Sequence, residues 1–213
     1  MMPARYAVER HAWDEAAAIQ PRMPDYLAWD NYWWPESLSW FAHGLGAVHT
    51  GNLAVAHAAE SHMIELRDRA RAANEAGFAT FIEIDRLILN GLLAQAEGDA
   101  QAAVSRMREA AGLEQTVEKH PITPGALLPP NEALGDLLLE QGRSQEALQA
   151  YETSLGIWPN RYNSLLGAAR SARAAGETER AQQYYRRLLD IAGGASDERE
   201  GLREAREAVG EMP

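Results

Sequence analysis

Apolar residues recur at helical intervals in the second half of the chain. The first stripe consists of Leu134, Leu137 and Leu138. This spacing places the side chains on one face of a helix. Gly142 follows the stripe and indicates a helix end, because glycine readily adopts the left-handed conformation that closes helices. A second stripe, with Ala147 and Tyr151, runs up to Pro159, which cannot continue a helix. The pattern predicts two antiparallel helices joined by a tight turn.

The same arrangement returns 34 residues later. The matched pairs are Gly135 and Ala169, Gly142 and Gly176, Ala147 and Ala181, and Tyr151 and Tyr185. Gly135 should let the second helix approach closely, Ala147 is the small contact on that helix, and Tyr151 is its large core side chain. A fixed period of this length is typical of helix pairs that stack into a solenoid.

These residues resemble the tetratricopeptide repeat family, most strongly over residues 128–191. The resemblance implies an all-α, right-handed α-solenoid of about four helix pairs with a C-terminal capping helix. At the start of the chain, Ala4 and Ala16 match small contact positions and His11 stands where glycine is usual. The weaker matches between these two regions are Trp40, Gly44, Gly51, Ala56, Leu87, Gly91, Gly98, Ala103 and Met107.

The upstream repeats are longer than the regular ones. Gly51 and Gly98 are 47 residues apart. This spacing predicts a long helix from about Asn52 to Ala76, a turn at Gly77 and another helix to Glu97.

We expect one repeat domain over residues 1–213. Its expected parts are a partial repeat with a Trp-rich connection (1–35), two elongated helix pairs (36–115), a proline-rich loop (116–128), two regular repeats (129–192) and a capping helix (196–210). Ser196 is the expected N-cap of the last helix. The thin apolar stripe of that helix would cover the last repeat while its other face stays wet. That stripe consists of Leu202, Ala205 and Val209.

Composition restricts the classes of partner. The formal net charge of −11 gives no general attraction to nucleic acid or anionic membranes. The absence of cysteine excludes disulfides, thiolate metal sites and cysteine nucleophiles. The sequence shows neither a membrane-spanning apolar run nor a signal peptide, so we expect a soluble, cytoplasmic protein. Lys119 is the only lysine and alanine is abundant, which suggests a bacterial source.

Two segments are similar to the C-terminal portion of larger bacterial tetratricopeptide-repeat proteins, most of unassigned role. They read EKHPITPGALLPPNEALGDLLLEQGR and AYETSLGIWPNRYNSLLGAARSA. This resemblance implies a fold and no reaction. It suggests a fragment or a stand-alone relative, because the first repeat lacks its beginning.

In a solenoid of this kind the first helix of each pair lines a concave surface, and family members commonly bind peptides there. Members that clamp a C-terminal carboxylate use lysine and asparagine, whereas this chain has apolar or acidic residues at the corresponding places, so we reject that subclass. The leading hypothesis is a non-catalytic scaffold that binds a protein or peptide in this groove; alternatively, these faces are solvated or self-packed. Helical spacing assigns these exposed groove positions to Phe41, Leu45, His49, Asp85, Ile88, Leu92, Gln95, Glu132, Asp136, Asn163, Leu166, Arg170 and Arg173.

Four of the six tryptophans lie between residues 29 and 40. Trp40 occupies a core position of the repeat, so we expect it to be buried. The other three tryptophans form an aromatic patch together with a tyrosine: Trp29, Tyr32, Trp33 and Trp34. This patch either pads the end of the solenoid or binds a peptide, proline or cation. A third possibility is that it docks a missing upstream region or a second copy of the chain.

The alternative hypothesis is a small-ligand or metal-binding module at the Trp- and His-rich end. His57 and Glu60 are three residues apart, with His43 on the preceding helix, but there is no HExxH pair. A buried, hydrogen-bonded pair of His43 and Asn90 is the simpler interpretation. No nucleophile elbow, phosphate-binding loop or dinucleotide fingerprint occurs. We therefore expect no enzymatic activity and no cofactor.

Overall fold

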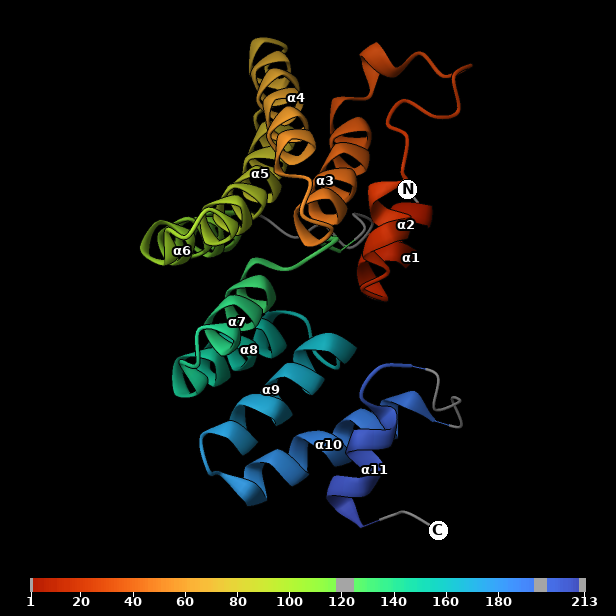
Figure 1. The fold of residues 1–213 in the computed structure, drawn as a ribbon. Coiled ribbons are helices and arrows are strands. Elements are labelled where there is room, and N and C mark those ends of the chain that lie inside the picture. Colours follow the sequence, from red (N-terminus) through yellow and green to blue (C-terminus); the bar gives the residue numbers. More distant parts are fainter. Residues whose placement is uncertain (1, 118–124, 194–198, 211–213) are drawn as a thin grey trace. The chain divides into compact units, whose positions relative to one another are not determined.

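The computed structural model describes residues 2–117, 125–193 and 199–210 (Figure 1). Every regular element within these ranges is a helix, which confirms the all-α prediction. The chain divides into two compact units, residues 1–130 and 131–213. The expected single domain over the whole chain stays a prediction. None of the helices in the described ranges is long and apolar enough to cross a membrane.

The first unit is a series of helix pairs. Its elements are α1 (Met2–Glu9), α2 (Trp13–Ala17), the short 3-10 helix η1 (Trp29–Asn31), α3 (Trp33–His49), α4 (Leu53–Ala72), α5 (Ala76–Ala96) and α6 (Ala100–Thr116). Helices α1 and α2, α3 and α4, and α5 and α6 pack as consecutive pairs. The first helices of successive pairs are also neighbours, since α3 contacts both α1 and α5. This is the packing expected of stacked helix pairs.

The second unit continues this plan with two shorter pairs and a terminal helix. Its elements are α7 (Pro130–Glu140), α8 (Ser144–Ile157), α9 (Tyr162–Ala174), α10 (Thr178–Ala192) and α11 (Leu202–Val209). Helix α9 packs against both α8 and α10, and α11 packs against α10.

Four of the predicted glycine turns are confirmed, at Gly51, Gly98, Gly142 and Gly176. Each of the four turn glycines has a positive φ, the conformation that side chains rarely tolerate. His11 has a φ of +52° at the turn between α1 and α2, so it takes the place of glycine there. The φ values are +80° at Gly51, +90° at Gly98, +73° at Gly142 and +81° at Gly176.

Tyr151 fills the space between three helices of the second unit. The residue is 1% exposed and lies on α8. A Cβ atom added to Gly135 of α7 would lie 2.8 Å from the tyrosine ring, and one added to Gly167 of α9 would lie 2.2 Å from its Cζ. Ala147 is fully buried. The predicted roles of Gly135, Ala147 and Tyr151 in packing are therefore confirmed.

The turn between the two long helices is not at Gly77. Helix α4 ends at Ala72 and α5 begins at Ala76, so Gly77 lies in the first turn of α5. Asn74 makes the reversal instead, with a φ of +61°. Asparagine is among the few residues with a side chain that visit this conformation readily.

The terminal helix is shorter than predicted. It begins at Leu202, directly after Gly201, whose φ is +82°. Ser196, the predicted N-cap, lies outside the described residues. The predicted loop at 116–128 is described only at its ends, where α6 ends at Thr116 and α7 begins at Pro130.

Candidate functional site

The predicted groove face is largely covered in the first unit. Phe41, Leu45 and Ile88 are fully buried and Asp85 is 6% exposed, so the prediction that they line an exposed surface is wrong. The cause is clear for α3, because α1, α2, α4 and α5 all pack around it. The predicted groove residues of this unit that remain exposed or half-buried are His49, Leu92 and Gln95.

Asp85 belongs instead to a buried acidic pair. It lies on α5 opposite Glu114 of α6, which is also 6% exposed. Burial, together with the charge of Glu114, raises the pKa of Asp85 to about 8, although Arg5 of α1 opposes this rise. The Arg5 guanidinium also donates hydrogen bonds to the carbonyl oxygens of Gly125 (2.6 Å) and Ala126 (3.3 Å). The pair therefore holds a carboxyl group that is mostly neutral at pH 7.

Glu132 is likewise buried rather than exposed, so its predicted place on an exposed surface is also wrong. Its side chain accepts hydrogen bonds from Arg161 Nε (2.7 Å) and Ser164 Oγ (2.5 Å), both at the start of α9. Glu132 thus joins the first helices of two successive pairs. Asp136, one turn later on α7, is exposed and accepts a hydrogen bond from the Tyr151 hydroxyl at 2.5 Å.

The chain's own tail covers the end of the predicted face in the second unit. Leu166 of α9 is 4% exposed, and a Cβ on Gly201 would lie 2.5 Å from its Cδ1. The prediction that Leu166 is exposed is therefore wrong. Asn163 is half-buried. The neighbouring ion pairs are Arg170 with Glu200 (2.9 Å), Arg170 with Glu204 (2.9 Å) and Arg173 with Glu204 (2.8 Å).

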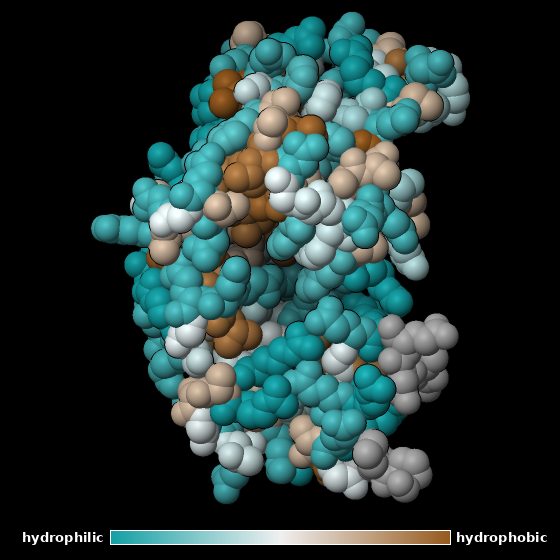
Figure 2. Space-filling view, in the orientation of Figure 1, coloured by the Kyte–Doolittle hydropathy of each residue, from teal (hydrophilic) through white to brown (hydrophobic). Residues whose placement is uncertain are grey.

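The predicted aromatic patch does not form one surface. Trp29 is 8% exposed, and its indole Nε1 donates to the carbonyl oxygen of Pro24 at 2.9 Å. Trp34 is half-buried against two phenylalanines of α5, with ring centroids 5.7 Å from Phe78 and 5.6 Å from Phe81. Figure 2 shows apolar surface gathered on the first unit, where α3, α4 and α5 lie. The other two patch residues are Trp33, which is half-buried, and Tyr32, which is exposed.

Two tryptophans stack on histidines. Trp40 is only half-buried, so the prediction that it lies in the core is wrong; its ring stacks on that of the exposed His62 of α4, with centroids 4.1 Å apart. Trp13 lies between His49 at 3.9 Å and His11 at 5.1 Å. Burial of the His49 ring, with the charge of His11 adding to it, lowers the pKa of His49 to about 4.

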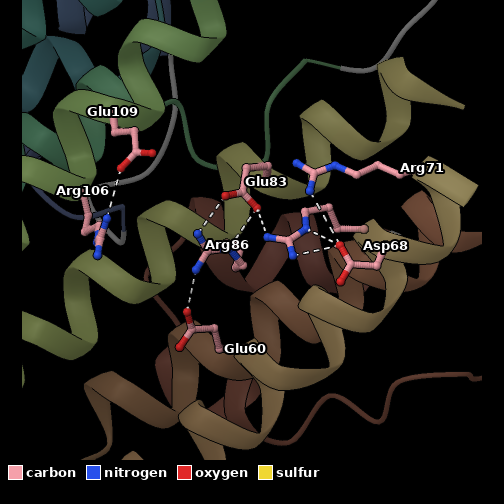
Figure 3. A network of polar contacts seen from close by, with 8 residues as sticks. Glu60, Asp68, Arg71, Glu83, Arg86, Arg106 and Glu109 are labelled. Carbon is pink, nitrogen blue, oxygen red and sulfur yellow. Dashed lines mark hydrogen bonds and ion pairs between the residues drawn. The ribbon is translucent and has the colours of Figure 1, made fainter.

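A network of arginines and carboxylates joins α4 to α5 (Figure 3). Arg86 donates to Glu60 at 2.8 Å and to both oxygens of Glu83 at 2.8 and 2.9 Å. Arg67 donates to Glu83 at 2.7 Å. Burial by itself would raise the pKa of Glu83, but the hydrogen bonds from the two arginines outweigh it and lower that pKa. The network is a structural clamp between two long helices.

The residues considered for a metal site do not converge. His57 pairs with Glu97 at 2.7 Å, whereas Glu60 pairs with Arg86. Within the described ranges, no group of three or more histidines and carboxylates could hold a metal ion. His43 Nδ1 is buried and has no hydrogen-bond partner there, so the predicted pair with Asn90 has no support either.

Comparison with known families identifies the repeat. Residues 138–200 match the family model described as tetratricopeptide repeat. The matched stretch runs from the end of α7 through α8, α9 and α10 and reaches the ion-paired segment before α11. The repeat prediction is confirmed for this stretch. No curated protein matches the chain.

Proposed function

Because the chain carries tetratricopeptide repeats at residues 138–200, we propose that it is a non-catalytic scaffold that binds a protein or peptide segment along the first helices of its pairs. Repeats of this family generally mediate protein–protein interaction. The family match is the observation that carries the proposal.

Only part of the groove face is accessible to a partner. On the first unit, Leu92 and Gln95 of α5 are half-buried, and His49 at the end of α3 keeps part of its surface exposed although its ring is stacked on Trp13. On the second unit, Asp136 of α7 and Asn163 of α9 are accessible. A peptide in such a place gains affinity from apolar side chains that it buries and specificity from polar neighbours.

An aromatic surface is proposed as a second contact area. It comprises three residues of the predicted patch, the exposed Tyr32 and the half-buried Trp33 and Trp34, together with Phe78 of α5, which is 38% exposed and stacks on Trp34. Aromatic side chains are enriched at protein interfaces because they bury a large area. Trp29 is excluded from this area because it is buried.

A charge placed on the proposed surface tests the function. The partner is first captured from cells with the full wild-type chain, identified, purified and titrated. We expect Leu92→Glu to weaken binding at least about tenfold, since a carboxylate would enter the apolar contact. The matched control is Gln101→Glu on the exposed face of α6, the second helix of the α5–α6 pair. It adds the same charge away from the proposed surface and should leave binding unchanged. If Leu92→Glu binds the partner as tightly as the control and the wild type do, the first helices are not the binding surface.

A further inference from the structure

Helix α11 is held by few apolar contacts and many polar ones. Of its eight residues, Leu202 and Ala205 are fully buried. Glu204 accepts hydrogen bonds from the Tyr185 hydroxyl (2.5 Å) and from Arg170 Nε (3.0 Å). Burial by itself would raise the pKa of Glu204, but these hydrogen bonds outweigh it and lower that pKa. Glu204 is therefore docked as a carboxylate.

The residues just before α11 add to the docked surface. The Tyr162 hydroxyl donates to the Glu200 carbonyl oxygen at 2.6 Å, and the Arg199 guanidinium lies 3.5 Å above the Tyr162 ring. Glu200 and Glu204 are one helical turn apart, with Leu202 between them in sequence. The tail thus presents a leucine flanked by two carboxylates to the arginines of α9.

The docked tail occupies the positions that helical spacing assigns to partner binding. Leu166, Arg170 and Arg173 all lie on α9, and all three contact residues between 200 and 204. We propose that this α9 surface is a binding site for an amphipathic helix of a partner protein that carries two carboxylates one turn apart around an apolar anchor, and that α11 is a displaceable stand-in for it. The proposal rests on the proposed scaffold function and names the class of partner for the second unit.

Two physical properties make α11 displaceable. A helix of eight residues is unstable in water by itself, so α11 depends on docking to stay folded. Its ion pairs are partly exposed and are weakened by salt. A partner helix with the same pattern and more apolar contact would compete for the same arginines. A helix with basic residues in place of these two carboxylates would be repelled by Arg170 and Arg173.

Binding of a peptide to the full chain tests the proposal. The probe is a fluorescein-labelled peptide with the sequence of residues 199–210, and its fluorescence anisotropy is followed. We expect Leu202→Asp, which removes the apolar anchor of the chain's own tail, to bind the probe at least about tenfold more tightly than wild type. Adding Arg170→Glu should weaken that binding at least about tenfold. The matched control is Arg203→Asp on the exposed side of α11, which should behave as wild type.

A variant that unfolds can be distinguished from one that folds but does not expose the α9 surface. If Leu202→Asp unfolds the chain, Glu204→Gln replaces it, because this change loosens the ion pairs and keeps the leucine; we then expect a smaller gain in probe binding. Loss of the fold in both variants, or no gain in any folded one, overturns the proposal. A wild-type dimer that Leu202→Asp abolishes also overturns it, in favour of a second copy as the occupant. The Leu92→Glu experiment concerns the other unit, so the scaffold function can fail or stand independently of this result.

Discussion

Replacement of Asp85 by asparagine should stabilise the first unit, and the gain should grow with pH. The pKa of Asp85 is raised from 3.8 to about 8, mainly by burial and also by Glu114. Between these two values the folded chain keeps a proton that the unfolded chain has released, so the free energy of unfolding falls as pH rises. Asparagine keeps the shape of the side chain and does not ionise. The variant therefore escapes this loss.

The size of the effect follows from the pKa. A shift from 3.8 to about 8 spans about four pH units, each worth about 1.4 kcal/mol, which sets an upper limit of about 6 kcal/mol at pH 8. Relaxation and water penetration around a buried charge reduce this limit. We expect Asp85→Asn to be more stable than wild type by about 2–4 kcal/mol at pH 8 and by about 1 kcal/mol or less near pH 4.5.

Urea unfolding followed by circular dichroism measures the difference at both pH values. Asp25→Asn serves as the control, because Asp25 is an exposed acid in the same unit and its replacement should change little. An Asp85→Asn variant that gains no stability between pH 4.5 and pH 8, or that is less stable at both, would refute the buried-acid interpretation.

Two further predictions concern other buried contacts. Gly167→Ala should destabilise the second unit by about 2 kcal/mol, because its methyl group would lie 2.2 Å from Tyr151; thermal unfolding measures this against Gly156→Ala, which meets nothing within 4 Å. The His49 pKa of about 4, caused by burial and by His11, predicts that its ring NMR signals do not titrate between about pH 8 and 5. Since the unfolded chain would bind that proton near pH 6.5, stability should fall as pH drops from there towards 4. A titration midpoint near 6.5 would contradict the stacked arrangement.

The repeat skeleton was predictable because local rules determine it. Gly142 ends its helix through a backbone conformation that glycine adopts readily, and Gly135 is small because Tyr151 lies against it. These constraints act over one helix pair, so the sequence period reveals them. Even His11 could be placed at a turn by its position in the repeat.

Exposure could not be predicted in the same way. Helical spacing says which residues share a face, but not what else packs on that face. Leu166 and Arg170 do share a face of α9, and a segment about 30 residues later in the chain covers it. The tryptophans show the same limit, since Trp29 is buried by a connection outside the repeat pattern while Trp40 lies partly at the surface.

The buried acid left a signal in the sequence. Asp85 stands among Ile84, Leu87 and Ile88, in a stretch of α5 that is apolar on more than one face. A carboxyl group in such a stretch indicates either a functional site or a raised pKa. Its partner Glu114 left no such signal, because acidic residues are ordinary on a helix such as α6.

Hydrogen–deuterium exchange of the full chain, with and without the partner captured from cells, shows directly whether the first helices of the pairs are the binding surface. We expect the partner to slow exchange in the first helices of the pairs, above all in α5 and α7, and to leave the second helices α6 and α8 unchanged. Protection confined to α6 and α8, or no protection in any helix at saturating partner, would contradict the claim that this chain binds proteins along its first helices.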